Sequence, residues 1–213
     1  MATDPVTKEV WTTAFGKEFG NIAQGDSKTG EQGTNCVFVM NHKQIQNIPR
    51  DRTVTYARIV VNFRPQKEDP NRVRITASGN LIRYPGELTT QTANISTSKM
   101  LWNSTMSTEG ARFAVANIAN MYLETLLDWY KYMRMPIDLI PQEVIDHYDL
   151  LLKVKNGYVY MEIIRGMYGL PQAGVLANKL LKERLSKHGC YEVPHTPGLF
   201  RHITHQIWFT LVV

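Results

Sequence analysis

Basic side chains are concentrated in one stretch of the chain. From Lys43 to Arg83 there are nine basic and three acidic residues, so this stretch carries a net charge of +6 and the remainder of the chain carries −1. Phosphates that bind basic side chains release condensed counterions, so a local positive field favours binding of a polyanion. A solvated basic surface is the alternative. The nine residues are Lys43, Arg50, Arg52, Arg58, Arg64, Lys67, Arg72, Arg74 and Arg83.

Two of these arginines lie six positions apart in the β-rich run Arg58-Ile-Val-Val-Asn-Phe-Arg64. A guanidinium group can donate two parallel hydrogen bonds to phosphate oxygens. Arg58 and Arg64 are therefore candidate ligands of a phosphate. A basic edge strand without a ligand is the alternative.

A third candidate region is Phe113-Ala-Val-Ala-Asn117-Ile-Ala-Asn-Met-Tyr122-Leu123. Residues 112–118 are predicted to form a strand, and its alternating side chains place Phe113, Val115 and Asn117 on one face. Tyr122 follows in the turn, five positions after Asn117. A buried strand with a packed tyrosine is the alternative.

The segment Tyr168-Gly-Leu-Pro-Gln172-Ala-Gly174 places a proline where a helix can begin. Its small residues allow the backbone to approach a nucleic-acid strand closely. Gln172 is then a candidate to hydrogen-bond a sugar or a base. The alternative is an ordinary proline-capped helix.

The predicted elements that must position these residues mix helices and strands without regular alternation, so the fold class is α+β. An apolar stripe of Trp11, Phe15, Phe19 and Ile22 predicts a helix over residues 6–23. Residues 36–40 and 53–61 are predicted to pair as a long hairpin with a basic tip. The other expected elements are strands over 72–76 and 157–164, a helix from Pro171 to Gly189, and a closing hairpin of 199–203 and 207–213.

The composition narrows the possible locations. No apolar run approaches the roughly 20 residues that a membrane span needs, and the N-terminus has no signal-peptide pattern. The two cysteines, Cys36 and Cys190, lie far apart and form no CxxC motif, which fits a reducing compartment. We expect a cytoplasmic or nuclear protein that is not secreted and has no membrane partner.

Taken together and in this order, the motifs resemble those of copia-type retrotransposon reverse transcriptases from about Val10 to Val213. Two further segments add to the resemblance: Tyr130-Lys-Tyr-Met-Arg-Met-Pro136 and the C-terminal Trp208-Phe-Thr-Leu-Val-Val213. The resemblance implies a mostly antiparallel sheet with packed helices, in a reverse-transcriptase-like arrangement of fingers and an incomplete palm. The implied parts are fingers in 1–97, a palm strand and helix in 98–124, a fingers-like insertion in 125–169 and a truncated palm in 170–213.

The resemblance also implies roles for individual residues. Arg58 matches the family's arginine that holds the triphosphate of the incoming nucleotide, Arg64 matches a second arginine of that strand, and Lys43 resembles a partner lysine. Tyr122 matches the aromatic residue that excludes a 2′-hydroxyl group, and Gln172 matches the glutamine next to the nascent base pair.

At Asn117 the chain departs from the family, which has a metal-binding aspartate there. The family's Asp-Asp pair follows a strand like the one that stops at Val213, so all three carboxylates are expected to be missing from this sequence. The alternative is a natural chain that continues beyond Val213 into the pair, and Asn117 would impair that chain as well. Nucleotidyl transfer on two Mg²⁺ ions needs anionic oxygens, and an amide oxygen offers only a dipole. We therefore expect no catalytic activity and no cofactor, whereas the intact family uses Mg²⁺.

The sequence leaves two functions open. The first is a degenerate reverse transcriptase (RNA-directed DNA polymerase) fragment whose partners are an RNA or DNA template-primer and deoxynucleotides. The second is a non-catalytic module, derived from such an element, that binds RNA or single-stranded DNA. The sequence does not indicate an oligomeric state.

Overall fold

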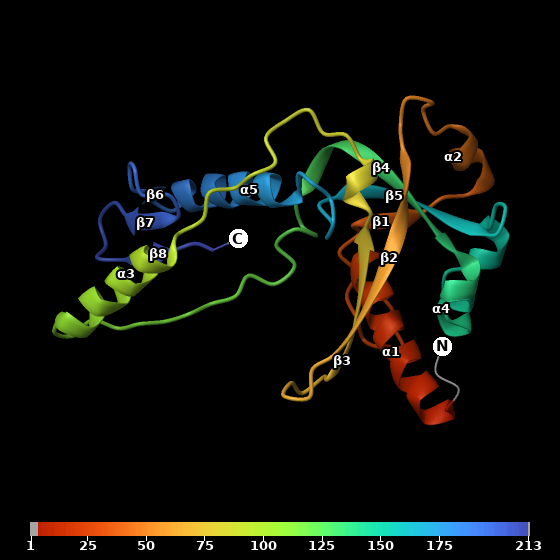
Figure 1. The fold of residues 1–213 in the computed structure, drawn as a ribbon, viewed down its shortest axis with the longest axis horizontal. Helices are drawn as coiled ribbons and strands as arrows, with labels where there is room; N and C mark the ends of the chain where they lie inside the picture. Colours follow the sequence, from red (N-terminus) through yellow and green to blue (C-terminus); the bar gives the residue numbers. More distant parts are fainter. Residues whose placement is uncertain (1–3, 213) are drawn as a thin grey trace. The chain divides into compact units, whose positions relative to one another are not determined.

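The computed structural model describes residues 4–212, which contain α-helices and two β-sheets, so the predicted α+β class is confirmed. The chain divides into two compact units, and each is built from two separate stretches (Figure 1). The first unit contains residues 4–85 and 122–173, and the second contains residues 86–121 and 174–212. No helix in the described range is long and apolar enough to cross a bilayer.

The first unit contains a five-stranded mixed sheet. Its strand order is β1-β5-β4-β2-β3; β2 pairs with β4 in parallel and the other neighbours pair antiparallel. The predicted reverse-transcriptase-like and mostly antiparallel character is not confirmed by this mixed pairing. The strands are β1 (Val37–Val39), β2 (Val54–Phe63), β3 (Asn71–Ala77), β4 (Leu126–Pro136) and β5 (Tyr158–Arg165).

One face of this sheet is buried in the core of the first unit. Met133, Met161 and Ile163 have no exposed surface because alternate side chains of β4 and β5 point to this face. Helix α1 (Pro5–Ile22) adds its apolar stripe to the core and runs alongside β3 (Figure 1). The predicted helix over residues 6–23 is confirmed, and Phe19 and Ile22 of its stripe are fully buried.

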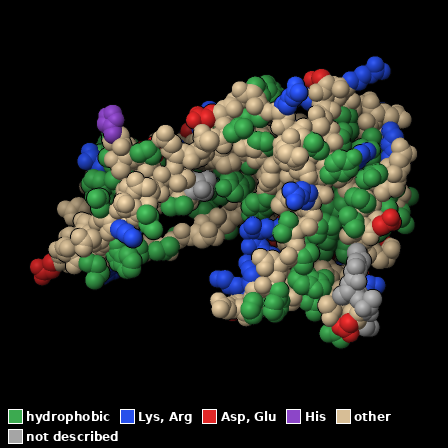
Figure 2. All heavy atoms as spheres, in the orientation of Figure 1, with side chains coloured by type: hydrophobic (Ala, Val, Ile, Leu, Met, Phe, Trp, Pro, Cys, Tyr) green, Lys and Arg blue, Asp and Glu red, His purple; other side chains and the backbone are tan. Residues whose placement is uncertain are grey.

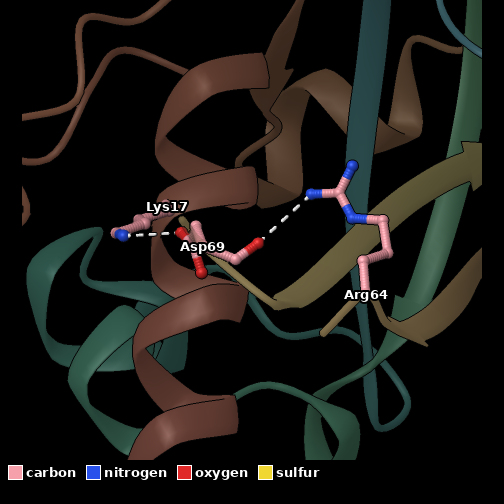
Figure 3. A network of polar contacts seen from close by, with 3 residues as sticks. All are labelled: Lys17, Arg64 and Asp69. Atoms are coloured by element: carbon pink, nitrogen blue, oxygen red, sulfur yellow. Dashed lines mark hydrogen bonds and ion pairs between the residues drawn. The ribbon is translucent and has the colours of Figure 1, made fainter. Parts of the chain in front are cut away.

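Polar contacts fasten the β2–β3 hairpin to α1. The Glu18 carboxylate accepts a hydrogen bond from the outward-pointing Ile75 N–H at 3.1 Å. Lys17 forms an ion pair with Asp69 at 2.9 Å, and Arg64 Nη2 donates to the Asp69 carbonyl oxygen at 3.4 Å (Figure 3). Both ends of the hairpin turn are therefore held near the helix.

The predicted hairpin between residues 36–40 and 53–61 is wrong. β1 pairs with β5, and β2 pairs with β3 and β4. Between β1 and β2 the chain forms α2 (His42–Gln46). This helix begins with a reciprocal capping box between Asn41 and Gln44. The loop between β2 and β3 is shorter than the segment between β1 and β2. Closing a shorter loop costs less conformational entropy.

Short helical segments complete the first unit. They are η1 (Gly79–Leu81), η2 (Ile137–Leu139), α4 (Gln142–His147) and η3 (Leu150–Lys153).

The second unit contains two helices and a three-stranded antiparallel sheet. The sheet order is β6-β7-β8, and the predicted closing hairpin is confirmed as β7 and β8. Phe200 and Phe209 stack across this hairpin with ring centroids 5.2 Å apart. The elements are α3 (Ile95–Ser107), α5 (Ala173–Lys187, whose first residue belongs to the first unit), β6 (Cys190–Glu192), β7 (Leu199–His202) and β8 (Trp208–Thr210).

The predicted strand over residues 112–118 is also wrong. These residues are irregular and exposed, and no ladder pairs them with a described strand. A strand is stable only when a neighbouring strand forms hydrogen bonds with its backbone N–H and C=O groups. The β-rich composition of this segment is therefore insufficient to make it a strand.

Candidate functional site

Three arginines share the open face of the β2–β3 hairpin. In the register of the two strands, Arg58 lies opposite Thr76, Val60 opposite Arg74, and Asn62 opposite Arg72. Side chains that are paired across strands, or two residues apart along one strand, point to the same side. We call Arg58, Arg72 and Arg74 the arginine group. It lies on the face opposite Ile59, Val61 and Val73.

The arginine group carries positive charge without direct neutralisation. Within residues 4–212, no carboxylate lies within ion-pair distance of its three guanidinium groups. Burial, followed by repulsion from Arg74 and Arg64, lowers the pKa of Arg72. The Arg74 Nε atom is buried and has no hydrogen-bond partner in the described part of the chain. In Figure 2, Lys and Arg side chains lie along the β2–β3 hairpin.

The charges of Arg72 and Arg74 affect the pKa of the nearby Glu18 carboxyl group. Burial raises the pKa of the Glu18 carboxyl group, whereas the hydrogen bond from Ile75 and the charges of Arg72 and Arg74 lower it by less. The carboxylate is already engaged by the Ile75 N–H. Glu18 therefore connects α1 to the edge of β3, and it lies beyond ion-pair distance of the arginine group.

Tyr168 and Tyr122 lie next to the arginine group. The Arg74 guanidinium carbon is 5.1 Å from the centroid of the Tyr168 ring, a cation–π contact. The Tyr168 and Tyr122 rings meet edge-to-face with centroids 5.8 Å apart. The structure therefore brings Tyr122, the predicted sugar-selecting residue, close to an arginine that the sequence analysis did not single out.

A close backbone contact positions Tyr168. The Ala77 N–H at the end of β3 donates to the Tyr168 carbonyl oxygen at 2.8 Å. Gly169 follows with a φ of +90°, and a Cβ atom there would collide with the Ala77 carbonyl oxygen. Only glycine fits both conditions. The small residues of this segment were predicted to let a nucleic-acid strand approach the backbone, and in the structure Gly169 lets β3 approach it.

Gln172 lies in the same segment and is 2% exposed. Its Oε1 atom has no hydrogen-bond partner within residues 4–212. A buried amide oxygen without a donor costs free energy, so such atoms are usually matched by a water molecule or a ligand. The prediction that Gln172 hydrogen-bonds a nucleotide stays a prediction.

The other two basic candidates are placed differently. Arg64 lies beside the hairpin turn, where it donates to Asp69 (Figure 3). Lys43 is exposed on α2, and no strand pairing connects it to Arg58, because the hairpin expected to join them does not form. Their predicted roles in nucleotide binding stay predictions.

Asn117 belongs to the second unit. It is exposed and lines a hollow of about 540 Å³ between α3, residues 112–118, α5 and β8. None of the described residues that line this hollow is an aspartate or a glutamate. Residues 4–212 contain no group of three or more His, Cys, Asp or Glu side chains placed to hold a metal ion. The residues around Asn117 do not fit a pair of Mg²⁺ ions, which need hard anionic oxygens.

We did not predict that Arg72, Arg74 and Tyr168 form one site. A usable signal was present, because Arg72-Val-Arg74 alternates within a predicted strand and both arginines must share a face. The approach of Tyr168 to this strand had no such signal.

Comparison with known proteins gives no relative: no family model, no curated protein and no solved structure matches the chain. The resemblance to copia-type reverse transcriptases therefore stays a prediction.

Proposed function

We propose that the chain is a reverse-transcriptase-like domain of a copia-type retrotransposon that binds nucleic acid and nucleotides but does not polymerise them. The observation that carries this proposal is the arginine group: three guanidinium groups on one open sheet face that no carboxylate within residues 4–212 pairs with. Guanidinium groups bind phosphate oxygens in bidentate geometry, and several on one face suit a polyanion.

The neighbours of the arginine group support a nucleotide as one ligand. A phosphate bound by Arg58 and Arg74 would place the attached sugar near the Tyr168 and Tyr122 rings, since Arg74 contacts Tyr168 directly. In this arrangement Tyr122 limits the space at the 2′ position. The same segment holds Gln172, whose Oε1 atom has no hydrogen-bond partner within residues 4–212 and would accept a hydrogen bond from the nucleotide.

The lack of polymerase chemistry follows from Asn117. An amide in place of a carboxylate, in a hollow whose described lining carries no acidic side chain, gives no anionic oxygens to gather two divalent ions. The described residues bind and orient a nucleotide or a nucleic-acid strand without catalysing its reaction.

A non-catalytic module that binds RNA or single-stranded DNA is the second candidate. The same arginine group favours it, because phosphate binding alone needs neither Tyr122 nor Gln172. The two candidates differ in whether a free deoxynucleoside triphosphate competes with a polynucleotide. Competition supports the polymerase-derived site, and polynucleotide binding without competition supports the module.

Fluorescence anisotropy of a labelled oligonucleotide, measured between about 50 and 200 mM salt, tests the proposal. Log affinity is expected to fall linearly with log salt, and the double variant Arg58→Ala/Arg74→Ala should bind more weakly, with a shallower slope by roughly 1 for each lost phosphate contact. Arg83→Ala is the matched control, because Arg83 is exposed and lies outside the sheet. The proposal is contradicted if the affinity does not change with salt concentration, or if the double variant binds as tightly as the unmodified chain.

A further inference from the structure

Three tyrosines surround Arg134 on the open face of the five-stranded sheet. The Arg134 guanidinium carbon lies 4.6 Å from the ring centroid of Tyr56 and 4.6 Å from that of Tyr158. The guanidinium group also donates to the hydroxyl oxygens of Tyr56 and Tyr160. We call Tyr56, Tyr158 and Tyr160 the tyrosine group.

The strand register places the tyrosine group on one surface. Arg134 of β4 lies opposite Tyr56 in the parallel pair with β2 and opposite Tyr160 in the antiparallel pair with β5. The intervening residues Thr55, Met133 and Met161 point to the other face and are fully buried. Aromatic side chains therefore occupy the outward face of strands whose inward face is core, and Tyr56 is 40% exposed.

The tyrosine group continues into the arginine group. Tyr56 and Arg58 are two residues apart on β2, so they point to the same side about 7 Å apart along the strand. Arg134 adds a charge that no carboxylate within residues 4–212 pairs with, and its hydrogen bonds to Tyr160 and Tyr56 raise its pKa. The surface combines aromatic rings with cations, and both kinds of group recognise nucleotides.

We propose that the tyrosine group is a stacking surface for unpaired bases, so that the domain prefers single-stranded nucleic acid to a duplex. Every base has a flat face that can stack on an aromatic ring or on a guanidinium plane, whatever the sequence. In a duplex these faces are already stacked on neighbouring base pairs. The inference rests on the proposed nucleic-acid binding, because Arg58 would hold the phosphate of a strand whose base stacks on Tyr56.

The test compares three labelled probes of equal length: single-stranded DNA, single-stranded RNA and duplex DNA. Tyr56→Ala is expected to weaken binding of both single strands about fivefold or more, the cost of one lost stacking contact. Duplex affinity and the salt slope should stay as in the unmodified chain, because no phosphate contact is lost. Tyr56→Phe, which keeps the ring, should bind within about twofold of the unmodified chain.

Tyr84→Ala is the matched control, because Tyr84 is half-buried in a loop outside the sheet and should leave all three affinities unchanged. A second measurement does not depend on how any variant folds. A single strand that carries 5-bromouracil, irradiated with the unmodified chain, should crosslink to peptides that contain Tyr56, Tyr158 or Tyr160.

The outcomes separate the two proposals. Two results together would contradict the stacking surface. The first is that Tyr56→Ala keeps the single-strand affinity or weakens single-strand and duplex binding equally. The second is that the crosslinks map to peptides without Tyr56, Tyr158 or Tyr160. Loss of binding in Arg58→Ala/Arg74→Ala would then still support phosphate binding by the arginine group. If the unmodified chain binds none of the three probes, the stacking surface and the proposed function fail together. Unequal affinities for the DNA and RNA strands, both reduced by Tyr56→Ala, identify the preferred strand and support the stacking surface.

Discussion

The rings of Tyr122 and Tyr168 meet edge-to-face, with planes at 85° and centroids 5.8 Å apart. Tyr168 also lies under the Arg74 guanidinium group, so a tyrosine that follows the irregular segment of residues 112–118 is tied to the charged face of β3. Such aromatic contacts contribute roughly 0.5–1.5 kcal/mol beyond the area that they bury. Tyr122 therefore contacts Tyr168 directly, and Tyr168 in turn contacts Arg74 of β3.

Replacement of Tyr122 should change the choice of nucleotide. In competition against a labelled oligonucleotide, the unmodified chain is expected to bind deoxynucleoside triphosphates better than ribonucleoside triphosphates. Tyr122→Ala should reduce this preference about tenfold, because the ring no longer fills the space at the 2′ position. Tyr122→Phe should keep the preference. An unmodified chain that binds both nucleotides equally would show that Tyr122 selects no sugar.

Asn117→Asp should not create a polymerase. One carboxylate cannot hold two Mg²⁺ ions, and no other acidic side chain among the described residues lines the hollow around position 117. Primer extension in Mg²⁺ or Mn²⁺ is expected to stay at background for the unmodified chain and for the variant, with an active reverse transcriptase as positive control. Nucleotide incorporation by either protein would refute the inactivity that we propose.

Gly169→Ala should destabilise the first unit. A φ of +90° is unfavourable for alanine, and the added Cβ would collide with the Ala77 carbonyl oxygen. We expect a loss of about 2–4 kcal/mol in the free energy of unfolding, from backbone strain and the collision together. Urea denaturation measures this loss.

Gly30→Ala is the control for that substitution. Gly30 has a similarly positive φ of +70°, but no atom lies within 4 Å of the position of an added Cβ. The expected loss is only about 1 kcal/mol, from the backbone conformation alone. Equal losses in the two variants would mean that the Gly169–Ala77 contact contributes nothing to stability.

Glu18 should make the first unit less stable as pH rises above the normal range of a glutamate. Burial raises the pKa of its carboxyl group above 4.5, so the folded chain holds a proton that the unfolded chain has already released. The free energy of unfolding contributed by Glu18 therefore falls from pH 4.5 up to the raised pKa and stays low above it. Glu18→Gln keeps an acceptor for the Ile75 N–H without the charge.

Urea denaturation at several pH values between about 4 and 8 tests this effect. The difference in stability between Glu18→Gln and the unmodified chain should shift in favour of the variant as pH rises. Asp69, whose pKa the hydrogen bond from Lys17 lowers, acts in the opposite direction: it stabilises the fold above pH 3.8, and this contribution is lost as pH falls through its lowered pKa. A pH-independent difference for Glu18→Gln would show that burial does not perturb the carboxyl group.

The elements that could be predicted from sequence are those that local patterns specify. The stripe of α1 repeats with the helical period, and its burial depends only on an apolar partner, so Phe15 and Phe19 were correctly predicted as one face. The closing hairpin of β7 and β8 joins neighbouring strands, so its pairing is local. The helix from Pro171 to Gly189 has clear start and stop residues and is confirmed as α5.

The elements that could not be predicted depend on partners far away in the sequence. Residues 112–118 have the composition of a strand, but no strand in the described part of the chain pairs with them. β1 could pair with any hydrophobic strand. Because it pairs with β5 and not with β2, Lys43 lies on α2 after a strand that does not pair with the strand of Arg58. The contact of Tyr56 with Arg134 needs the parallel register of β2 and β4, which no local pattern specifies.

The outer edge of β3 is closed along part of its length. Two of its backbone donors that point away from the sheet, at Ile75 and Ala77, are occupied by the Glu18 carboxylate and the Tyr168 carbonyl oxygen. A free strand edge is a template on which other polypeptides can add and grow into aggregates. Helix α1 and the loop that carries Tyr168 therefore occupy backbone donors at this edge on which another polypeptide could otherwise pair.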